Sequence, residues 1–412
     1  MIDDVLCVNE CGYKKKSSNA FITFKTDSKK LQFGSNKCKK LHIGKKKEEY
    51  KCESLKEDNW QEVEIVNDET GMQDIIDICN GEQVMEEKLE EKYLGDVIST
   101  DGRNIKNIKT RILKGKGINS RILTILDGIP YGQFYFEVAI LLRNSLLVSS
   151  MLTNTEAWYN ITKSEMELLE TIDLQFLRSI LKAPKCTPRE MLFLELGCVP
   201  FRHLTMKRRI LFLHYILNEE RTSMLYKFLI AQIRNKKKKD WISQVLDDLK
   251  KLELSENLEQ LKIMKTSTLK TLLNKLIKEL AFNELTQKKE NHSKVRNIMH
   301  TAFEMQNYLK SNTIKTTQEE RQEIFRLRCK VTDVKSNFKG KYDNLECNIC
   351  EKEEEQSQKH IIECMELNKN KSEEFEKMPR YEEIYKNNVS NQIKITRKFI
   401  VNMKRKKELE KQ

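Results

Sequence analysis

The sequence predicts a mostly helical protein with a small α+β segment at the amino terminus, a helical bundle, and a C-terminal CCHC zinc-binding motif with a closing helix. Its 412 residues include only 5 Pro and 13 Gly, and Lys and Glu dominate the polar positions, which favours long helices. Strand-like segments are confined to roughly the first hundred residues. Cysteines and a histidine near the carboxyl end have the spacing of a zinc site.

Composition and charge narrow the classes of protein to consider. Hydrophobic residues make up 39% and charged residues 33%, which indicates a polar protein with modest cores. No apolar run approaches the roughly 20 residues of a membrane span, and the pattern of a signal peptide is missing. We therefore expect an intracellular protein, nuclear and cytoplasmic, with no membrane partner. A formal charge of +13 favours RNA or DNA as partners, although lysine runs are more often solvated faces.

The first hundred residues alternate strand-forming and turn-forming segments. Up to about residue 66, strands are expected at DDVLCV, AFITFK, KKLQFG, KKLHIG and WQEVEIV, with Gly- and Lys-rich turns between them. The acidic segment MQDIIDICNGEQVMEEKLEEK is expected to form a helix. It leads into KYLGDVISTDGRN, which has a short strand and an Asp-Gly turn signal.

From Asn104 the pattern changes to a helical period. NIKNIKTRILKGKGINSRILTIL has isoleucines at three- and four-residue spacings, although Gly115 and Gly117 weaken the case for one unbroken helix. FEVAILLRNSLLVSSML is apolar on nearly all sides and is expected to be the central core helix. Further amphipathic helices follow to about residue 287, and the less apolar residues 288–315 are expected to form a hinge.

Capping signals delimit two helices of the bundle. Thr162 and Glu165 form a capping box at the start of TKSEMELLETIDLQFLRSILKA. In TPREMLFLELG, Thr187 is expected to cap the helix, Pro188 to take its first position and Gly197 to end it.

The segment CNICEKEEEQSQKHIIEC has the spacing of a zinc site. Cys347 and Cys350 are separated by two residues, and His360 and Cys364 follow. A short turn can supply two sulfur ligands and a helix can supply the histidine and the last cysteine one turn apart. Four protein ligands leave no open position for water, so we expect structural Zn²⁺ here. Chance clustering of these residues is the alternative.

The other eight cysteines have no complete ligand spacing and are interpreted as reduced core or incidental residues: Cys7, Cys11, Cys38, Cys52, Cys79, Cys186, Cys198 and Cys329. No Ser, His and Asp set can be argued from the sequence, and LKGKGIN lacks the spacing and hydroxyl of a phosphate-binding loop. Asp3 and Asp4 are an acidic pair in a strand-like stretch. They either hold a divalent cation such as Mg²⁺ or lie at a solvated chain end.

The chain resembles the carboxy-terminal part of reverse transcriptases of non-LTR (LINE-like) retrotransposons. The resemblance runs through nearly the whole chain and rests on KYLGDVISTDGRNIKNIKTRILKGKGINSRILTIL, LRNSLLVSSMLTNTEAWYNITKSEMELLETIDLQFLRSIL, TPREMLFLELGCVPFRHLTMKRRILFLHYIL and the CCHC motif. It implies five segments: the end of a palm (1–98), a helical thumb-like domain (99–254), a charged helical connector (255–330), the zinc-binding motif (331–370) and a basic C-terminal helix (371–412).

The resemblance also implies a role for the acidic pair. Ile2, Asp3 and Asp4 match the palm motif that helps to bind the two Mg²⁺ ions of nucleotidyl transfer, and this favours an ancestral metal-binding role. The family needs a further aspartate on an earlier palm strand, and fingers, all of which precede this motif. We therefore expect a truncated RNA-directed DNA polymerase that is inactive alone, retains RNA and DNA binding, and lacks an N-terminal portion of the element protein.

The thumb-like domain would follow a primer–template duplex with basic side chains near its start: Lys106, Lys109, Arg111, Lys114, Lys116 and Arg121. Arg326, Arg328 and Lys330 are a weaker second set, because a basic helix is commonly only solvated. Trp158 and Tyr159 either stack on bases or, more commonly for aromatic residues in a helical domain, pack against neighbouring helices. The alternative function is a retroelement-derived zinc-finger protein that binds nucleic acid or protein without chemistry.

Overall fold

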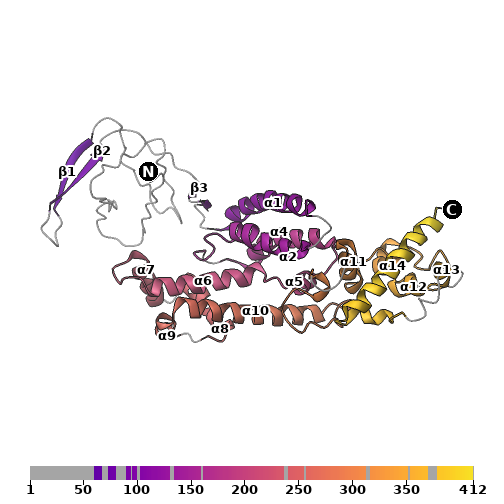
Figure 1. Cartoon of the computed structure of the whole chain (residues 1–412). Coiled ribbons are helices and arrows are strands. Elements are labelled where there is room, and N and C mark those ends of the chain that lie inside the picture. Colours follow the sequence, from indigo (N-terminus) through magenta and orange to yellow (C-terminus); the bar gives the residue numbers. More distant parts are fainter. Residues whose placement is uncertain are drawn as a thin grey trace. The chain divides into compact units, whose positions relative to one another are not determined.

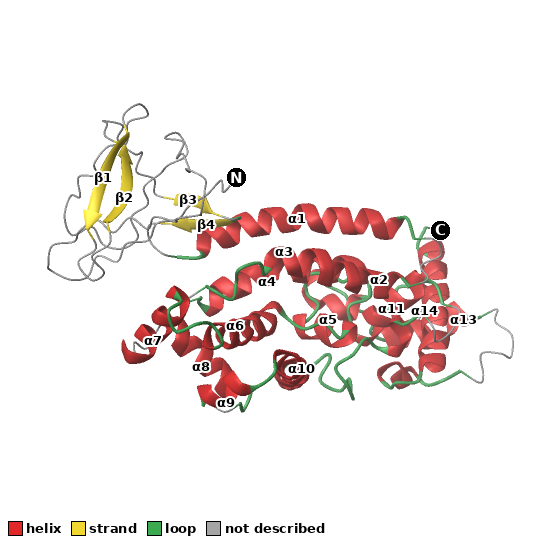
Figure 2. Cartoon of the chain, turned by 60° about the vertical axis from the view of Figure 1, so that its left-hand side comes forward, coloured by secondary structure: helices red, strands yellow, loops and turns green. Residues whose placement is uncertain are grey.

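The computed structural model describes most of the chain beyond residue 102 and short stretches before it: residues 60–66, 73–79, 90–93, 95–99, 103–129, 134–158, 161–235, 240–254, 257–311, 316–350, 353–369 and 378–411. The chain divides into two units, Met1–Thr110 and Arg111–Gln412. The expectation of a mostly helical protein is confirmed, and Figure 2 shows helix throughout the second unit.

The strands described in the first unit form two separate antiparallel hairpins. β1 (Trp60–Val66) pairs with β2 (Gln73–Cys79), and β3 (Glu90–Tyr93) pairs with β4 (Asp96–Ser99). The strand expected at WQEVEIV is confirmed, but the helix expected at the following acidic segment is wrong where β2 and β3 lie. β2 is rich in isoleucine, whose branched Cβ favours extended backbone. Each hairpin is a sheet by itself among the described residues, so the palm-like segment stays a prediction.

Helix α1 (Ile105–Asp127) is unbroken despite its two glycines. A Cβ atom on Gly115 would lie 2.8 Å from Cγ1 of Ile172 and 2.9 Å from Sδ of Met151. Gly115 therefore lets α1 approach its neighbours closely, whereas Gly117 faces open space. Asn119 fixes the same contact by donating a hydrogen bond of 3.0 Å to the carbonyl of Ile172.

The apolar segment expected as the central helix is a continuous run of three pieces. These are α2 (Tyr135–Leu142), a π-helical turn (Arg143–Val148) and α3 (Ser149–Met151). Phe136 and Met151 are fully buried. Leu141 is 65% exposed, so burial on all sides is not observed.

The capping signals are largely confirmed. Thr162 and Glu165 form the predicted capping box at the start of α4 (Lys163–Leu181). Helix α5 (Arg189–Leu196) ends at Gly197, whose φ is 63° and whose Cβ would lie 2.5 Å from the carbonyl carbon of Glu304.

The predicted start of α5 is wrong by one residue. Pro188, with ψ of 131°, is the N-cap residue and not the first helical residue. The hydroxyl of Thr187 is buried without a hydrogen-bond partner, so it does not cap the helix.

Helices α6 to α10 pack around a shared hydrophobic core. They are α6 (Phe201–Leu217), α7 (Met224–Asn235), α8 (Trp241–Lys251), α9 (Leu258–Ile263) and α10 (Thr266–Glu290). α6 and α10 lie side by side in Figure 1. Leu213 and Leu273 are fully buried between these helices, and Trp241 of α8 belongs to the same cluster.

The described part of residues 288–315 packs against α5 and is not a hinge. Leu196 and Met305 form an isolated antiparallel bridge, and the backbone N–H of Gln306 donates to the carbonyl of Glu195 at 2.9 Å. Val295 and Ile298 are buried. Apolar residues are sparse in this segment, but Tyr308 and Leu309 are also buried, whereas Met299 is 73% exposed.

The carboxyl end is a compact group of short elements and one long helix. After the short η4 (Asn307–Leu309) come α11 (Gln318–Arg328), η5 (Lys335–Lys341), α12 (Gln358–Glu363), α13 (Met365–Asn368), η7 (Tyr381–Tyr385) and α14 (Val389–Leu409). α14 packs against α11 and α12. Among the helices that the structure describes, none is both long and apolar enough to cross a membrane.

Candidate functional site

The four residues of the CCHC motif converge on one point. Cys347, Cys350, His360 and Cys364 each offer one ligand atom, and these atoms all lie within 4.8 Å of one another. Sγ of Cys350 is 3.4 Å from Nε2 of His360, close to the edge of a tetrahedron around a metal, which is roughly 3.5 Å. The cluster could therefore hold a metal ion such as zinc.

Short-range hydrogen bonds build this cluster. Glu346 and Glu355 form an isolated bridge, and the backbone N–H of Cys347 donates to the carbonyl of Glu354 at 2.9 Å. Ser357 caps α12 by accepting a hydrogen bond from the N–H of His360 at 3.1 Å. One helical turn then brings Cys364 next to His360.

Glu354 orients the histidine ligand, a role that the sequence reasoning missed. Its carboxylate lies 2.8 Å from Nδ1 of His360, so Nδ1 carries the proton and Nε2 presents its lone pair to the cluster. The signal that could have found Glu354 is an acidic residue six positions before a ligand histidine, within a loop that must fold back on it.

The long C-terminal helix α14 forms hydrogen bonds with residues next to the metal-ligand cluster. Asn402 of α14 donates to the carbonyl of Ile361 at 2.7 Å, and Nζ of Lys406 donates to Oε1 of Gln356 at 3.0 Å. Asn368 donates to the carbonyl of Cys364 at 2.6 Å. The donor set fits Zn²⁺, because three sulfurs and one imidazole are soft or borderline ligands and no carboxylate belongs to it.

The basic residues predicted as a nucleic-acid surface all lie on α1. Five of them are exposed: Lys106, Lys109, Lys114, Lys116 and Arg121. The helical period places these five on the half of α1 opposite Ile108, Gly115 and Ile122, which are buried. α1 carries six basic residues and one acidic residue, Asp127, at its end.

Arg111 differs from the other five. It is only 4% exposed, donates a hydrogen bond of 2.8 Å to the carbonyl of Met151, and its guanidinium lies 4.8 Å from the ring centroid of Trp158. Arg111 is thus a buried packing residue and is removed from the predicted nucleic-acid surface. Trp158 is 6% exposed, so of its two interpretations the packing one is confirmed. Asp3, Asp4 and Tyr159 lie outside the described residues.

Glu195 is the centre of a buried polar cluster that the sequence did not indicate. Its carboxylate accepts from Arg328 at 3.0 and 3.1 Å, from Tyr308 at 2.7 Å, and lies 3.1 Å from Nε2 of His300. Burial opposes its ionisation, but Arg328, His300 and Tyr308 outweigh this and lower the pKa of Glu195 to about 2. Arg328 is fully buried, so it is excluded from the second basic set.

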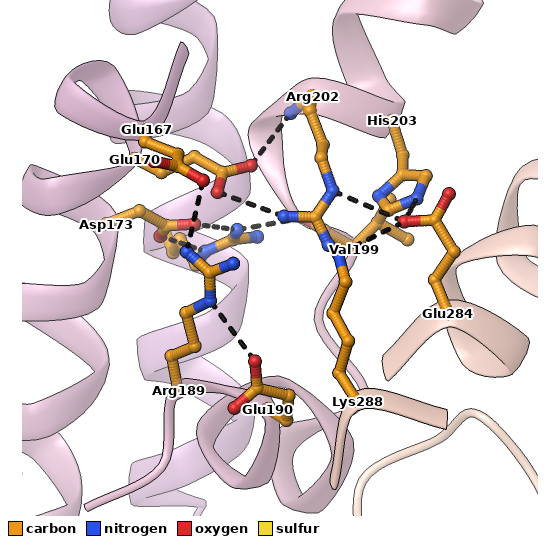
Figure 3. A network of polar contacts seen from close by, with 11 residues as sticks. Glu167, Glu170, Asp173, Arg189, Glu190, Val199, Arg202, His203, Glu284 and Lys288 are labelled. Atoms are coloured by element: carbon orange, nitrogen blue, oxygen red, sulfur yellow. Dashed lines mark hydrogen bonds and ion pairs between the residues drawn. The ribbon is translucent and has the colours of Figure 1, made fainter. Parts of the chain in front are cut away.

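A second polar network, shown in Figure 3, ties α4 to α6 and α10. Arg202 lies between two carboxylates, 3.3 Å from Glu170 and 3.6 Å from Glu284. The imidazole of His203 is 3.4 Å from Glu284, and His203 together with Arg202 lowers the pKa of Glu284 to about 2 against the effect of burial. These charges neutralise one another between helices, which is the arrangement of a structural network.

No family model, curated protein or solved structure was found to match the chain.

The function is therefore inferred from residues and geometry, and two features bear on it. One is the CCHC cluster with its supporting glutamate. The other is the basic, solvent-facing half of α1.

Proposed function

We propose that this chain is a nucleic-acid-binding protein derived from a non-LTR retrotransposon reverse transcriptase, in which α1 binds the backbone of an RNA or DNA duplex. The observation that carries the proposal is the exposed half of α1. Five cations project from it, and the sixth basic residue is buried. A helix with cations along one exposed face and no acidic residue before its last position attracts closely spaced phosphates.

We further propose that the CCHC cluster holds Zn²⁺ in a structural role. Four protein ligands leave no open coordination position for substrate or water. The ion would fix the loop before α12 and the end of α12 to each other. This part of the chain would then support binding by holding the C-terminal fold together, and polymerase chemistry is not expected of it.

A protein-binding role for the metal centre is the second candidate. Glu353, Glu354 and Glu355 are exposed next to the ligands, and such a cluster repels phosphate. Under this alternative, binding would depend on the loop and not on α1.

The test is binding of the full chain to fluorescein-labelled RNA, DNA and RNA–DNA duplexes, followed by fluorescence anisotropy. The variant Lys114→Glu/Arg121→Glu reverses two cations two turns apart on α1. We expect it to weaken binding by roughly 10- to 100-fold and to reduce the steepness of the salt dependence, because about two phosphate contacts are lost.

The matched control is Lys275→Glu/Lys278→Glu, which makes the same charge change on exposed positions of α10. It should retain affinity within about threefold, because only the net charge is altered. Equal losses in the two variants would show that binding depends on net charge and would remove α1 from the account.

A further inference from the structure

A hollow lies between the carboxyl-terminal half of α6 and the junction of α9 with α10. Its volume is about 600 Å³, and its lining includes His214, Tyr215, Lys262, Lys265 and Lys270. None of the lining residues belongs to α1. The hollow is therefore separate from the surface proposed above.

Hydrogen bonds hold the wall of this hollow in place. Nε2 of His214 lies 2.8 Å from the carbonyl oxygen of Met264, in the junction between α9 and α10. The side-chain amide of Asn218 donates to the carbonyl of His214 at 2.9 Å and to that of Lys262 at 3.4 Å. The junction is thus bound to α6 by side chains, so the lysines start from a fixed backbone and binding loses less conformational entropy.

The charge of the hollow is positive. Three lysines contribute to it, and none of its lining residues that the structure describes is acidic, although Glu219 interacts with the hydroxyl of Tyr215 next to it. Thr266 opens α10, a helix of 25 residues with no acidic residue in its first turn. The positive end of the helix dipole therefore adds to the field of the lysines.

The hollow also offers apolar and aromatic surface. Tyr215 is 53% exposed and Ile263 is 80% exposed, so an aromatic ring and an aliphatic side chain are both accessible to a ligand. The ring of Tyr215 stacks on Phe212 with centroids 6.3 Å apart and planes within 10° of parallel. Phe212 in turn contacts Trp241, so the tyrosine ring is backed by the hydrophobic core.

We infer that this hollow is a second site, which binds one unpaired nucleotide unit. The lysines Lys262, Lys265 and Lys270 would neutralise its phosphate, and the base would lie against Tyr215 and Ile263. A cationic rim next to an exposed aromatic ring is the arrangement by which proteins hold single-stranded nucleic acid without reading its sequence. The unit could belong to a free nucleotide or to a single strand, and the two sources share this chemistry.

The experiment is photo-cross-linking of the full chain with two probes, iodouridine monophosphate and a four-nucleotide RNA that contains one iodouridine. Mass spectrometry locates the modified residue. We expect a cross-link on Tyr215 and a loss of about tenfold in the variant Lys265→Glu/Lys270→Glu. The control Lys275→Glu/Lys278→Glu lies further along the same helix and should cross-link like the unmodified chain.

The probes distinguish the sources: a cross-link with the monophosphate indicates a nucleotide site, and one with the RNA alone indicates a strand site. No cross-link on Tyr215 with either probe, or one that the Lys265/Lys270 variant leaves unchanged, would overturn the inference. The variant Lys114→Glu/Arg121→Glu should keep the Tyr215 cross-link even though its duplex binding falls. The experiments therefore distinguish a failure of this site from a failure of the α1 proposal.

Discussion

At the scale of single residues, Glu195 joins parts of the chain that are far apart in sequence. Its side chain bonds to Tyr308 and Arg328, and its carbonyl accepts from the backbone of Gln306. Arg328 also donates to the carbonyl of Ile384 at 3.0 Å. One carboxylate thus connects α5 to the segment before α11, to α11 and, through Arg328, to η7.

Replacing Glu195 by Gln should be strongly destabilising. The guanidinium of Arg328 would stay buried without a counter-charge, and breaking such a pair costs about 3–5 kcal/mol in the free energy of unfolding. Urea unfolding followed by circular dichroism measures the loss. The control Glu279→Gln removes an exposed carboxylate paired with Lys275 and should cost less than about 1 kcal/mol. Similar losses in both variants would contradict a special role for the buried pair.

The same carboxylate predicts a pH dependence. Its pKa falls from an ordinary 4.5 to about 2 on folding, so its ionised form stabilises the folded state. That contribution is complete above about pH 5 and is lost as the pH falls from 4.5 towards 2. The stability difference between the unmodified chain and Glu195→Gln should therefore be constant above pH 5 and shrink in that window. A difference that is independent of pH down to 2 would refute the assignment.

Glu354 predicts a metal-affinity effect. Glu354→Gln removes the charged acceptor of the Nδ1 proton of His360, and loss of such a partner typically lowers metal affinity by about 10- to 100-fold. Competition between the full chain and a chelator for Zn²⁺, or for Co²⁺ followed by its absorption, measures the change. Glu353→Gln, a neighbouring exposed position, is the control and should keep the original affinity. Equal affinities in the two variants would show that Glu354 does not position the histidine.

At the scale of elements, α1 offers a test with two glycines. Gly115→Ala places a methyl group 2.8 Å from Ile172 and should lower the free energy of unfolding by about 1–3 kcal/mol. Gly117→Ala enters open space and should raise it by up to about 1 kcal/mol, because Ala favours helix more than Gly. Urea unfolding of both variants gives the comparison, and a stabilised Gly115→Ala variant would contradict the close packing of α1.

Local signals predicted local structure well. The capping box at Thr162 and the glycine at the end of α5 were found from the sequence because each depends on residues within one or two turns. The four metal ligands lie within a segment of eighteen residues, so their convergence could also be predicted from their spacing in the sequence. These features need no knowledge of how distant helices pack.

The features that could not be predicted from the sequence depend on partners far away in the chain. Arg111 and Arg328 look like solvent-facing cations on basic helices, yet Arg111 contacts the carbonyl of Met151 and Arg328 contacts Glu195, 133 positions away. Burial of a cation depends on such a partner, and one sequence does not reveal it. The isoleucines of β2 fit a helix or a strand, and pairing with β1 decides for the strand.

At the scale of the whole molecule, we propose that the chain binds nucleic acid without polymerising it. Its formal charge of +13 favours binding to polyanions in general. Five of its basic residues are exposed together on one half of α1. The exposed half of α1 does not include Asp3 and Asp4, the acidic pair to which the resemblance assigns metal binding. Binding should therefore be separable from chemistry.

The most direct measurement is primer extension on an RNA template with Mg²⁺, run beside filter binding of the same primer–template over a series of salt concentrations. We predict no extension by the chain or by its Asp3→Ala/Asp4→Ala variant. We also predict affinity that falls steeply with salt, with a logarithmic slope of roughly −0.9 per phosphate contact on a B-form duplex. Extension that the double variant abolishes, or binding that salt does not weaken, would contradict the account.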